Sequence, residues 1–426
     1  MFTTLSAPIG VQWEVTPVCN HNCKHCYNYW RDVQPTSSLT SNYFTLYPKI
    51  VSEILSNKVF SVIITGGEPL VVIRELRDYI KSLSDGGVSV SMNSNLTLLT
   101  PGKAKILKDC GIKSILVSLP SGDSKVCDQI TGSKGSLRKI VHGINLAKSF
   151  GFPIYVNMVV SKYNLSQINQ TAALVSSLGL PSFAVTKASD PSSGRGFTSQ
   201  LLTLTEFRQM QEELEITGKE FDLHVNSLEA NPVCSYGGHI PIQGYKFCTA
   251  GKTTCTIGFD GNVKPCNRAS ESYGNIDESL QLVWKRMEEW RSEVLLPEVC
   301  GSCAIKTRCM GGCKADAFTA FGSKKAADPM CDQKYIPQRG LPKVPIPQTQ
   351  DTQFLVNPRM QTRLEPFGSV LFVSTSAWVP VDQRLSKLFE NGKEMISIDE
   401  FQKVLGVELE KVIQVVSYLK HKQILL

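Results

Sequence analysis

The chain has 426 residues, more than one ordinary domain, and its 42% hydrophobic content excludes wholesale disorder. A net charge of +7 is too small for a dedicated nucleic-acid binder, and no apolar run approaches the roughly 18 residues of a membrane span. Because the first residues also lack the basic and apolar regions of a signal peptide, we expect a soluble cytoplasmic protein with no nucleic acid and no membrane among its partners.

From residue 10 to about residue 230, short apolar runs alternate with segments of helical period such as 43–54 and 137–144. Six such alternations predict an α/β fold whose parallel sheet is open or curled into a partial barrel. Ligands of these sheets bind at the carboxyl ends of the strands, so the loops that follow the strands are the candidate site. The predicted strands are Val11–Val15, Phe60–Ile64, Val88–Met92, Ser114–Ser118, Ile154–Val159 and Ser182–Thr186.

Three cysteines follow the first predicted strand at the spacing C-x3-C-x2-C: Cys19, Cys23 and Cys26. Three thiolates can hold three irons of a four-iron cluster and leave the fourth iron open, as a catalytic metal centre requires. The alternatives are a zinc site that also uses His21 or His25, or a chance grouping.

A second motif, Gly66-Gly67-Glu68, follows the second predicted strand. Paired glycines let the backbone approach a ligand closely, and the Glu68 carboxylate can bind an ammonium group. The alternative is an ordinary turn that leads into a helix.

Together, the two motifs resemble those of the radical S-adenosylmethionine (SAM) enzymes, over residues 10 to about 230. The resemblance implies a partial (β/α)6 TIM-like barrel, and a [4Fe-4S] cluster on the first three cysteines whose open iron binds SAM. One electron, from a donor such as ferredoxin or flavodoxin, then cleaves SAM to a 5′-deoxyadenosyl radical that abstracts a hydrogen atom. The residues that would contact SAM are Tyr27, Gly66, Gly67, Glu68, Asn95, Ser118 and Asn157. One departure is Thr131, which stands where relatives often have an arginine for the SAM carboxylate, so another group must bind that carboxylate.

Eight further cysteines lie between residues 248 and 331, enough to ligate two four-iron clusters, with two zinc knuckles as the alternative. Their spacing is similar to that of the SPASM domain, the auxiliary-cluster extension of peptide-modifying radical SAM enzymes, and makes three [4Fe-4S] clusters in all. The resemblance implies interleaved ligands: Cys248, Cys255, Cys266 and Cys313 for the first auxiliary cluster, and Cys300, Cys303, Cys309 and Cys331 for the second. The remaining cysteines are predicted to be small buried hydrophobes: Cys110, Cys127 and Cys234.

The residue after Cys266 limits which reactions the enzyme can be expected to catalyse. Sulfatase-maturing relatives have an acidic residue there that acts as a base, whereas this chain has Asn267, which cannot take up a proton near neutral pH. Sulfatase maturation is therefore disfavoured. The catalytic acid or base is unknown, with Glu271, His239 and Tyr236 as candidates.

The expected domains are a radical SAM barrel at 1–235, a SPASM domain at 236–336, a proline-rich linker at 337–362 and a small winged-helix-like module at 363–426. The module is predicted from a hairpin over 369–381, a capping box at Ser397 and Glu400, and an amphipathic helix over 409–419. It resembles the elements by which peptide maturases hold the leader of a precursor. Nucleic-acid binding is the rival, disfavoured by zero net charge from residue 363 onward (8 basic, 8 acidic), and a packing appendage is the third alternative.

The sequence as a whole favours a maturase of a ribosomally made peptide, similar to those acting on precursors with Nif11-like or nitrile-hydratase-like leaders. The expected partner is a precursor peptide (leader plus core), with a separate small leader-binding protein left open. Splicease-like backbone excision or rearrangement ranks first among outcomes, a side-chain cross-link second and epimerisation third. A SPASM enzyme acting on a small molecule is the alternative, and a plain electron carrier is disfavoured because Gly66-Gly67-Glu68 would then serve no purpose.

Overall fold

The computed structural model describes residues 4–28, 43–191, 197–242, 244–342, 345–390 and 392–426. Its centre is a nine-stranded sheet of order β7-β6-β5-β4-β3-β2-β1-β8-β9, in which every neighbouring pair is parallel except β8 and β9. The strands are β1 (Gly10–Glu14), β2 (Ser61–Thr65), β3 (Ser89–Ser94), β4 (Ile115–Ser118), β5 (Ile154–Val160), β6 (Ser182–Lys187), β7 (His224–Ser227), β8 (Thr254–Ile257) and β9 (Val263–Lys264).

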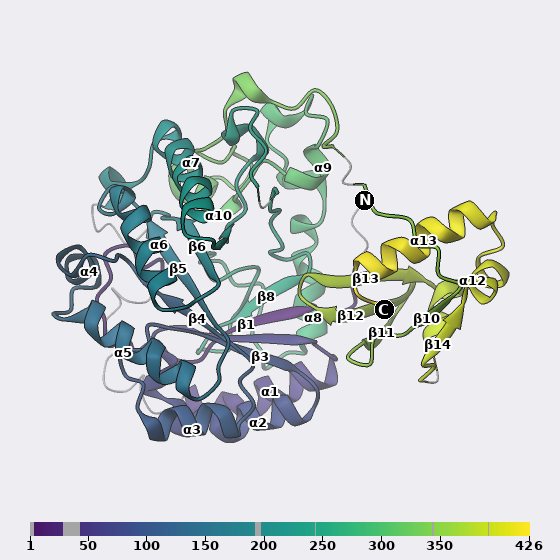
Figure 1. Ribbon diagram of the computed structural model, residues 1–426, viewed down its shortest axis with the longest axis horizontal. Helices are drawn as coiled ribbons and strands as arrows, with labels where there is room; N and C mark the ends of the chain where they lie inside the picture. Colours follow the sequence, from purple (N-terminus) through teal and green to yellow (C-terminus); the bar gives the residue numbers. More distant parts are fainter. Residues whose placement is uncertain (1–3, 29–42, 192–196, 243, 343–344, 391) are drawn as a thin grey trace.

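The sheet confirms the α/β partial barrel and all six predicted strands, and β7, β8 and β9 are additions that the sequence analysis missed. Helices cover the outer side of the sheet (Figure 1). None of the helices in the described ranges combines the length and apolar character of a membrane span. The helices up to the SPASM region are α1 (Tyr47–Ser56), α2 (Ile73–Asp85), α3 (Pro101–Asp109), α4 (Ser124–Thr131), α5 (Ser136–Ser149), α6 (Ile168–Ser177) and α7 (Leu204–Glu220).

Alternation along β1 explains how the sheet divides its two faces. Val11 and Trp13 point to the helices and are buried in the main core, whereas Gln12 and Glu14 point to the inner face. The carboxyl ends of the parallel strands meet at one edge, so the loops after β1 to β6 come together there.

The SPASM region is not a separate layer, because its first strand joins the barrel sheet. β8 pairs in parallel with β1, with Cys255 opposite Val11, and β9 returns antiparallel. The rest of the region consists of loops and short helices, as its glycine and cysteine content predicted: α8 (Leu280–Arg286), α9 (Lys306–Cys309) and α10 (Lys314–Phe321).

The C-terminal module contains a three-stranded sheet, β11 (Gln361–Glu365), β12 (Gly368–Ser374) and β13 (Ala377–Asp382), and a strand pair, β10 (Gln353–Leu355) with β14 (Met395–Ser397). Its helices are α11 (Gln383–Ser386), α12 (Ile398–Leu405) and α13 (Leu409–His421). The predicted hairpin, the capping box of Ser397 and Glu400, and the final helix are all confirmed.

The module begins earlier than the boundary at residue 363. Phe354 of β10 is fully buried in the module core, and the Thr349 amide donates to Ser417 Oγ of α13 at 3.0 Å. Residues 349–362, expected to be linker, therefore belong to the module. The reason is the pairing of β10 with β14, a long-range contact that a proline-rich composition does not reveal.

The module packs directly on the barrel (Figure 1), since β12 is buried on both faces. Leu371 faces the module helices, whereas Val370 and Phe372 pack against Ile9 and Phe60 of the barrel. The rings of Phe60 and Phe372 stack with centroids 4.6 Å apart and planes 11° from parallel. This contact lies where β1 and β2 begin, at the end of the sheet opposite the cysteine loop.

A buried ion pair reinforces the contact. Arg363 donates to Glu365 at 2.8 Å and to the backbone carbonyls of Ala7 and Pro8 at 2.7 and 2.8 Å. Glu365 also accepts the Ser6 amide at 2.7 Å. Both charged side chains are nearly inaccessible, so breaking either would leave the other unpaired in the interface.

Candidate active site

The loop with Cys19, Cys23 and Cys26 leaves β1 at the carboxyl edge of the sheet, and all three thiols are half-buried. The Asn22 amide donates to the Thr131 carbonyl at 2.8 Å, which holds the loop against the end of α4. The Thr131 hydroxyl bonds back into its own helix, so this residue supports the loop through its backbone.

The Gly66-Gly67-Glu68 loop packs directly under the cysteine loop. The Gly67 amide donates to the Thr16 carbonyl at 2.7 Å, and the Glu68 amide donates to the Val18 carbonyl at 2.9 Å. A Cβ on Gly66 would lie 2.7 Å from Thr16 O, and one on Gly67 would lie 2.1 Å from Val18 O. Both positions therefore require glycine for the close approach of the two loops.

Glu68 ties two strand ends together. Its carboxylate accepts hydrogen bonds from the Leu70 amide at 3.0 Å, from Ser94 Oγ at 2.7 Å and from the Asn95 amide at 2.8 Å. Burial raises the pKa of Glu68, and these three hydrogen bonds lower it by less, so the net shift is upward. A carboxylate has about four acceptor positions, and these bonds use two on Oε1 and one on Oε2.

The other predicted SAM contacts fall into two groups. Asn95 donates to Asn20 Oδ1 at 3.0 Å and so stands beside the cysteine loop. Ser118 and Asn157 are register partners on β4 and β5, and Asn157 accepts a hydrogen bond from Thr186 at 2.9 Å. The second group therefore lies farther along the same edge of the sheet.

Tyr27 and Asn267 join the barrel to the SPASM region. Asn267 Nδ2 donates to the Tyr27 hydroxyl at 2.7 Å. Burial raises the Tyr27 pKa, and the charges of Glu14 and Cys26 add to the shift. Asn267, at the position where sulfatase-maturing relatives have an acidic base, therefore contacts Tyr27. The loop after Cys266 thus lies beside a residue that is predicted to contact SAM.

A second contact between these parts is the buried ion pair of Glu14, which ends β1, and Lys264 of β9. Lys264 Nζ lies 2.9 Å from Glu14 Oε2, and each side chain is 1% exposed. Burial raises the pKa of Glu14 to about 7, although Lys264 lowers it. Three oxygens on this inner face have no hydrogen-bond partner within the described residues: Glu14 Oε1, Gln12 Oε1 and Thr256 Oγ1. The sequence analysis missed these residues, and the polar alternation of Gln12 and Glu14 was the available signal.

A third contact ties β6 to α10 beside the predicted first auxiliary cluster. Lys187 at the end of β6 pairs with Asp316 at 2.9 Å, and Arg268 pairs with the same carboxylate. Arg268 also donates to Cys313 Sγ at 2.9 Å. The guanidinium is thus positioned to offset negative charge on a thiolate at residue 313.

The four thiols predicted for the first auxiliary cluster do not share one environment. Cys255 is 1% exposed in the barrel core, where burial raises its pKa to about 12 and the Arg291 charge lowers it. Cys248 and Cys266, by contrast, are only partly buried against this core, and Cys313 accepts a hydrogen bond from Arg268. Cys255 is therefore the most deeply buried of the four thiols.

The four thiols predicted for the second auxiliary cluster line one small cavity: Cys300, Cys303, Cys309 and Cys331. A fifth thiol, that of Cys234, lines the same cavity, with its Sγ 3.5 Å from Cys331 Sγ. Cys234 is buried, as predicted, but it does not stand apart from the other cysteines, because the chain returns it to the SPASM region after β7.

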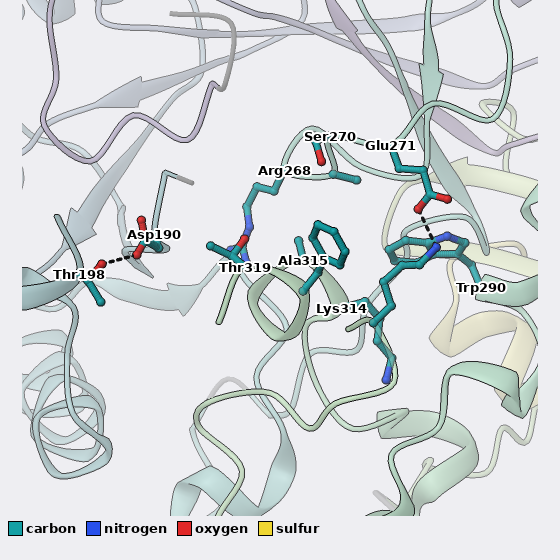
Figure 2. A pocket seen from close by; sticks show the side chains of 12 residues that line it. Asp190, Thr198, Arg268, Ser270, Glu271, Trp290, Lys314, Ala315 and Thr319 are labelled. Atoms are coloured by element: carbon teal, nitrogen blue, oxygen red, sulfur yellow. Dashed lines mark hydrogen bonds and ion pairs between the residues drawn. The ribbon is translucent and has the colours of Figure 1, made fainter. Parts of the chain in front are cut away.

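A cavity of about 510 Å³ lies beside the first auxiliary thiols. Arg268, Ala315 and Thr319 occupy its middle, with Asp190 and Thr198 toward one end and Glu271 and Trp290 toward the other (Figure 2). The cavity is lined by residues from the segment between β6 and α7, from the loop after Cys266 and from α10. It therefore lies where the barrel meets the SPASM domain. The remaining lining residues are Ala269, Ser270, Lys314, Phe318 and Lys324.

Of the three candidate bases, Glu271 alone lines this cavity, and it is paired with Lys324 at 2.6 Å. His239 is exposed and bonds Glu215 at 2.9 Å. Tyr236 is buried in the core.

The donor set fits iron–sulfur clusters in kind, because thiolates on loops are their usual ligands. Within the described ranges, no three histidine, cysteine, aspartate or glutamate side chains lie close enough to hold one metal ion. Cluster ligation therefore stays a prediction for each of the eleven cysteines.

Comparison with known families gives two matches within the chain. The radical SAM superfamily matches residues 13–175, and the iron–sulfur cluster-binding SPASM domain matches residues 248–304. Both domains imply SAM and iron–sulfur clusters as cofactors.

Two of the relatives found carry names for different activities. The AdoMet-dependent heme synthase of Methanosarcina barkeri is 29% identical over 78% of this chain and 98% of its own length. The mycofactocin maturase MftC of Mycobacterium tuberculosis is 29% identical over 77% of this chain and 84% of its own length.

Among solved structures, Streptococcus suis SuiB bound to its precursor peptide SuiA has a similar fold. The TM-score is 0.64 at 19% identity, over 77% of this chain and 76% of SuiB. The chain therefore carries a radical SAM domain followed by a SPASM iron–sulfur domain, and its relatives include both a peptide maturase and a heme synthase.

Proposed function

We propose that this enzyme modifies a ribosomally made precursor peptide by hydrogen abstraction. Bound SAM and a [4Fe-4S] cluster on Cys19, Cys23 and Cys26 would supply the 5′-deoxyadenosyl radical. The similarity to a mycofactocin maturase and to the fold of a precursor-binding maturase supports a peptide substrate. Backbone excision or rearrangement is the first proposed outcome, and a side-chain cross-link is the second.

The observation that carries the proposal is the cavity between barrel and SPASM domain. Its wall contains Arg268, which directly follows Asn267, and Asn267 donates to Tyr27. A substrate residue in the cavity would therefore lie between a predicted SAM contact and the thiols of Cys266 and Cys313. Its volume of about 510 Å³ is in the range of small-ligand sites, roughly 300–1,000 Å³, and its mixed charges suit peptide groups.

The chain's own residues have separate proposed tasks. The glycine–glutamate loop supports the cysteine loop from below, and the one acceptor position left on Glu68 is available for the SAM amino group. Asn267 holds the Tyr27 hydroxyl and so fixes the ring beside the cysteine loop. The eight later thiols are proposed to hold two auxiliary clusters beside the cavity, which gives three clusters in all.

The C-terminal module is proposed to bind the leader at an open edge of its three-stranded sheet. It packs where β1 and β2 begin, whereas the cavity lies at the other end of the strands. Strands of 5 to 7 residues rise about 3.3 Å per residue, so the sheet is roughly 20 Å deep. The precursor then needs an extended spacer of on the order of ten residues between its leader and its core. This spacer would pass around the edge of the barrel sheet, from the module to the cavity.

The test uses anaerobically purified protein with SAM, a low-potential reductant and a candidate precursor. We expect 5′-deoxyadenosine together with a mass change in the core of the precursor, and neither product from a variant with Cys19, Cys23 and Cys26 all changed to Ala. SAM cleavage without any modified peptide from any precursor tried would contradict the peptide assignment.

A second candidate is a small-molecule reaction, favoured by the heme synthase relative, which matches over 98% of its own length. The same reaction mixture distinguishes the two, with tetrapyrrole substrates in place of the peptide. Formation of heme, with precursor peptides unchanged, would select the second candidate.

A further inference from the structure

The second auxiliary site has five thiols where four were predicted. Cys234 lies in a 3-10 helix (Val233–Tyr236) just after β7 and lines the same cavity as the four predicted ligands. Its Sγ is 3.5 Å from that of Cys331, and Cys300 lines the same cavity. A four-iron cluster takes one terminal ligand per iron, so this site has one thiol more than a fully ligated cluster needs.

The two other unassigned cysteines show what an inert thiol looks like in this protein. Cys110 and Cys127 pack in the barrel core, and Cys110 donates to a carbonyl of its own helix. Cys234 is also buried, at 6% exposed, but it stands among sulfurs and not among aliphatic side chains alone. Its surroundings therefore differ from those of Cys110 and Cys127.

We propose that Cys234 is an alternative ligand of the second auxiliary cluster, able to bind the iron of Cys331. The exchange breaks the bond between iron and Cys331 Sγ and forms one between iron and Cys234 Sγ. Cys234 gives up its thiol proton and Cys331 takes one up, so charge and electrons balance and no oxidant is needed. The 3.5 Å separation of the sulfurs means that a short side-chain movement suffices.

The exchange changes what the cluster holds together. Cys331 lies at the end of the SPASM domain. Cys234 lies shortly after β7, in the part of the chain that forms the barrel. A cluster bound through Cys234 would join the barrel to the SPASM domain through iron–sulfur bonds. This inference rests on the proposed second auxiliary cluster, and the experiment separates the two.

The experiment counts iron in anaerobically reconstituted full-length protein and records low-temperature EPR spectra of the reduced clusters. Wild type should bind about twelve irons. Cys331→Ala should keep nearly all of them, because Cys234 replaces the lost ligand. Cys234→Ala/Cys331→Ala should lose about four irons and one EPR signal. The matched control, Cys110→Ala/Cys331→Ala, should behave as Cys331→Ala.

Two results would overturn the proposal. Loss of about four irons from Cys331→Ala alone, with no further change on adding Cys234→Ala, would show that Cys234 is not a ligand. A wild-type count of about eight irons would remove the second auxiliary cluster, and the proposal with it, while leaving SAM cleavage intact. If the Cys331→Ala variants do not fold, the same comparison is made with Cys331→Ser, which keeps the size of the side chain, with and without Cys234→Ala.

Discussion

Replacing Phe372 by alanine should detach the C-terminal module from the barrel. Phe372 is 2% exposed and stacks on Phe60 at 4.6 Å. Truncating a buried phenylalanine costs about 3–5 kcal/mol, of which the ring pair contributes about 0.5–1.5 kcal/mol. Since each 1.4 kcal/mol is tenfold, the open form should become roughly a hundred to several thousand times more populated.

Hydrogen exchange at the Ser6 amide measures this opening directly, because that amide donates to Glu365 across the interface at 2.7 Å. We expect its exchange to accelerate in Phe372→Ala, while amides of α13, inside the module, keep their protection. The control is Leu364→Ala, one residue from the buried Arg363 but 72% exposed, which should leave Ser6 unchanged.

Unchanged exchange of Ser6 in Phe372→Ala would refute the reasoning, since it would mean that the stacked rings do not hold the interface. Equal loss of protection in α13 would point instead to unfolding of the module itself.

Three other changes test the candidate site. Burial raises the pKa of Glu14 in the folded state from 4.5 to about 7. The folding stability gained when Glu14 binds a proton is therefore fully present below pH 4.5 and is lost as the pH rises through 7. Lys264→Met removes the positive charge beside Glu14, so the loss of folding stability at pH 8 should grow to about 3–5 kcal/mol. The measurement is the thermal midpoint, which should be lower at pH 8 than at pH 5. Adding Glu14→Gln should abolish this difference. Cys266→Ala should lose about four irons per chain, whereas Cys127→Ala, which changes a buried core thiol, should keep them, and equal losses would contradict the proposed first auxiliary cluster. Gly67→Ala should lower bound iron and SAM cleavage together, because the new Cβ would lie 2.1 Å from a carbonyl of the cysteine loop.

Local patterns predicted the barrel well. Each of the six predicted strands is a short apolar run whose identity depends on its own residues, and each is present within about two residues of its expected bounds. The capping box of Ser397 and Glu400 was equally readable, since both partners lie within one helical turn.

Long-range pairing explains what was missed. β8 joins β1 across more than 240 residues, and β10 joins β14 across 40, and neither pairing leaves a mark in the local pattern. Cys234 stands 97 residues before Cys331 and outside any spaced motif, so its place beside the second auxiliary thiols could come only from the fold. Gln12 and Glu14 alternate with apolar residues and so indicated a polar inner face, but the buried partner of Glu14, Lys264, could come only from the fold.

The position of β1 has a consequence for how the protein is made. This strand is hydrogen-bonded to β2 on one side and to β8 on the other, and the residues just before it are covered by β12. During synthesis, β1 emerges before both of its partner strands, and its edges are covered only after residues 254–257, and then residues near 370, have been made. An exposed strand edge on a nascent chain favours wrong pairing, so chains that stop before residue 254 should aggregate or need a chaperone. The cysteine loop directly follows this strand, and iron delivery to it should come late, after the SPASM region has left the ribosome.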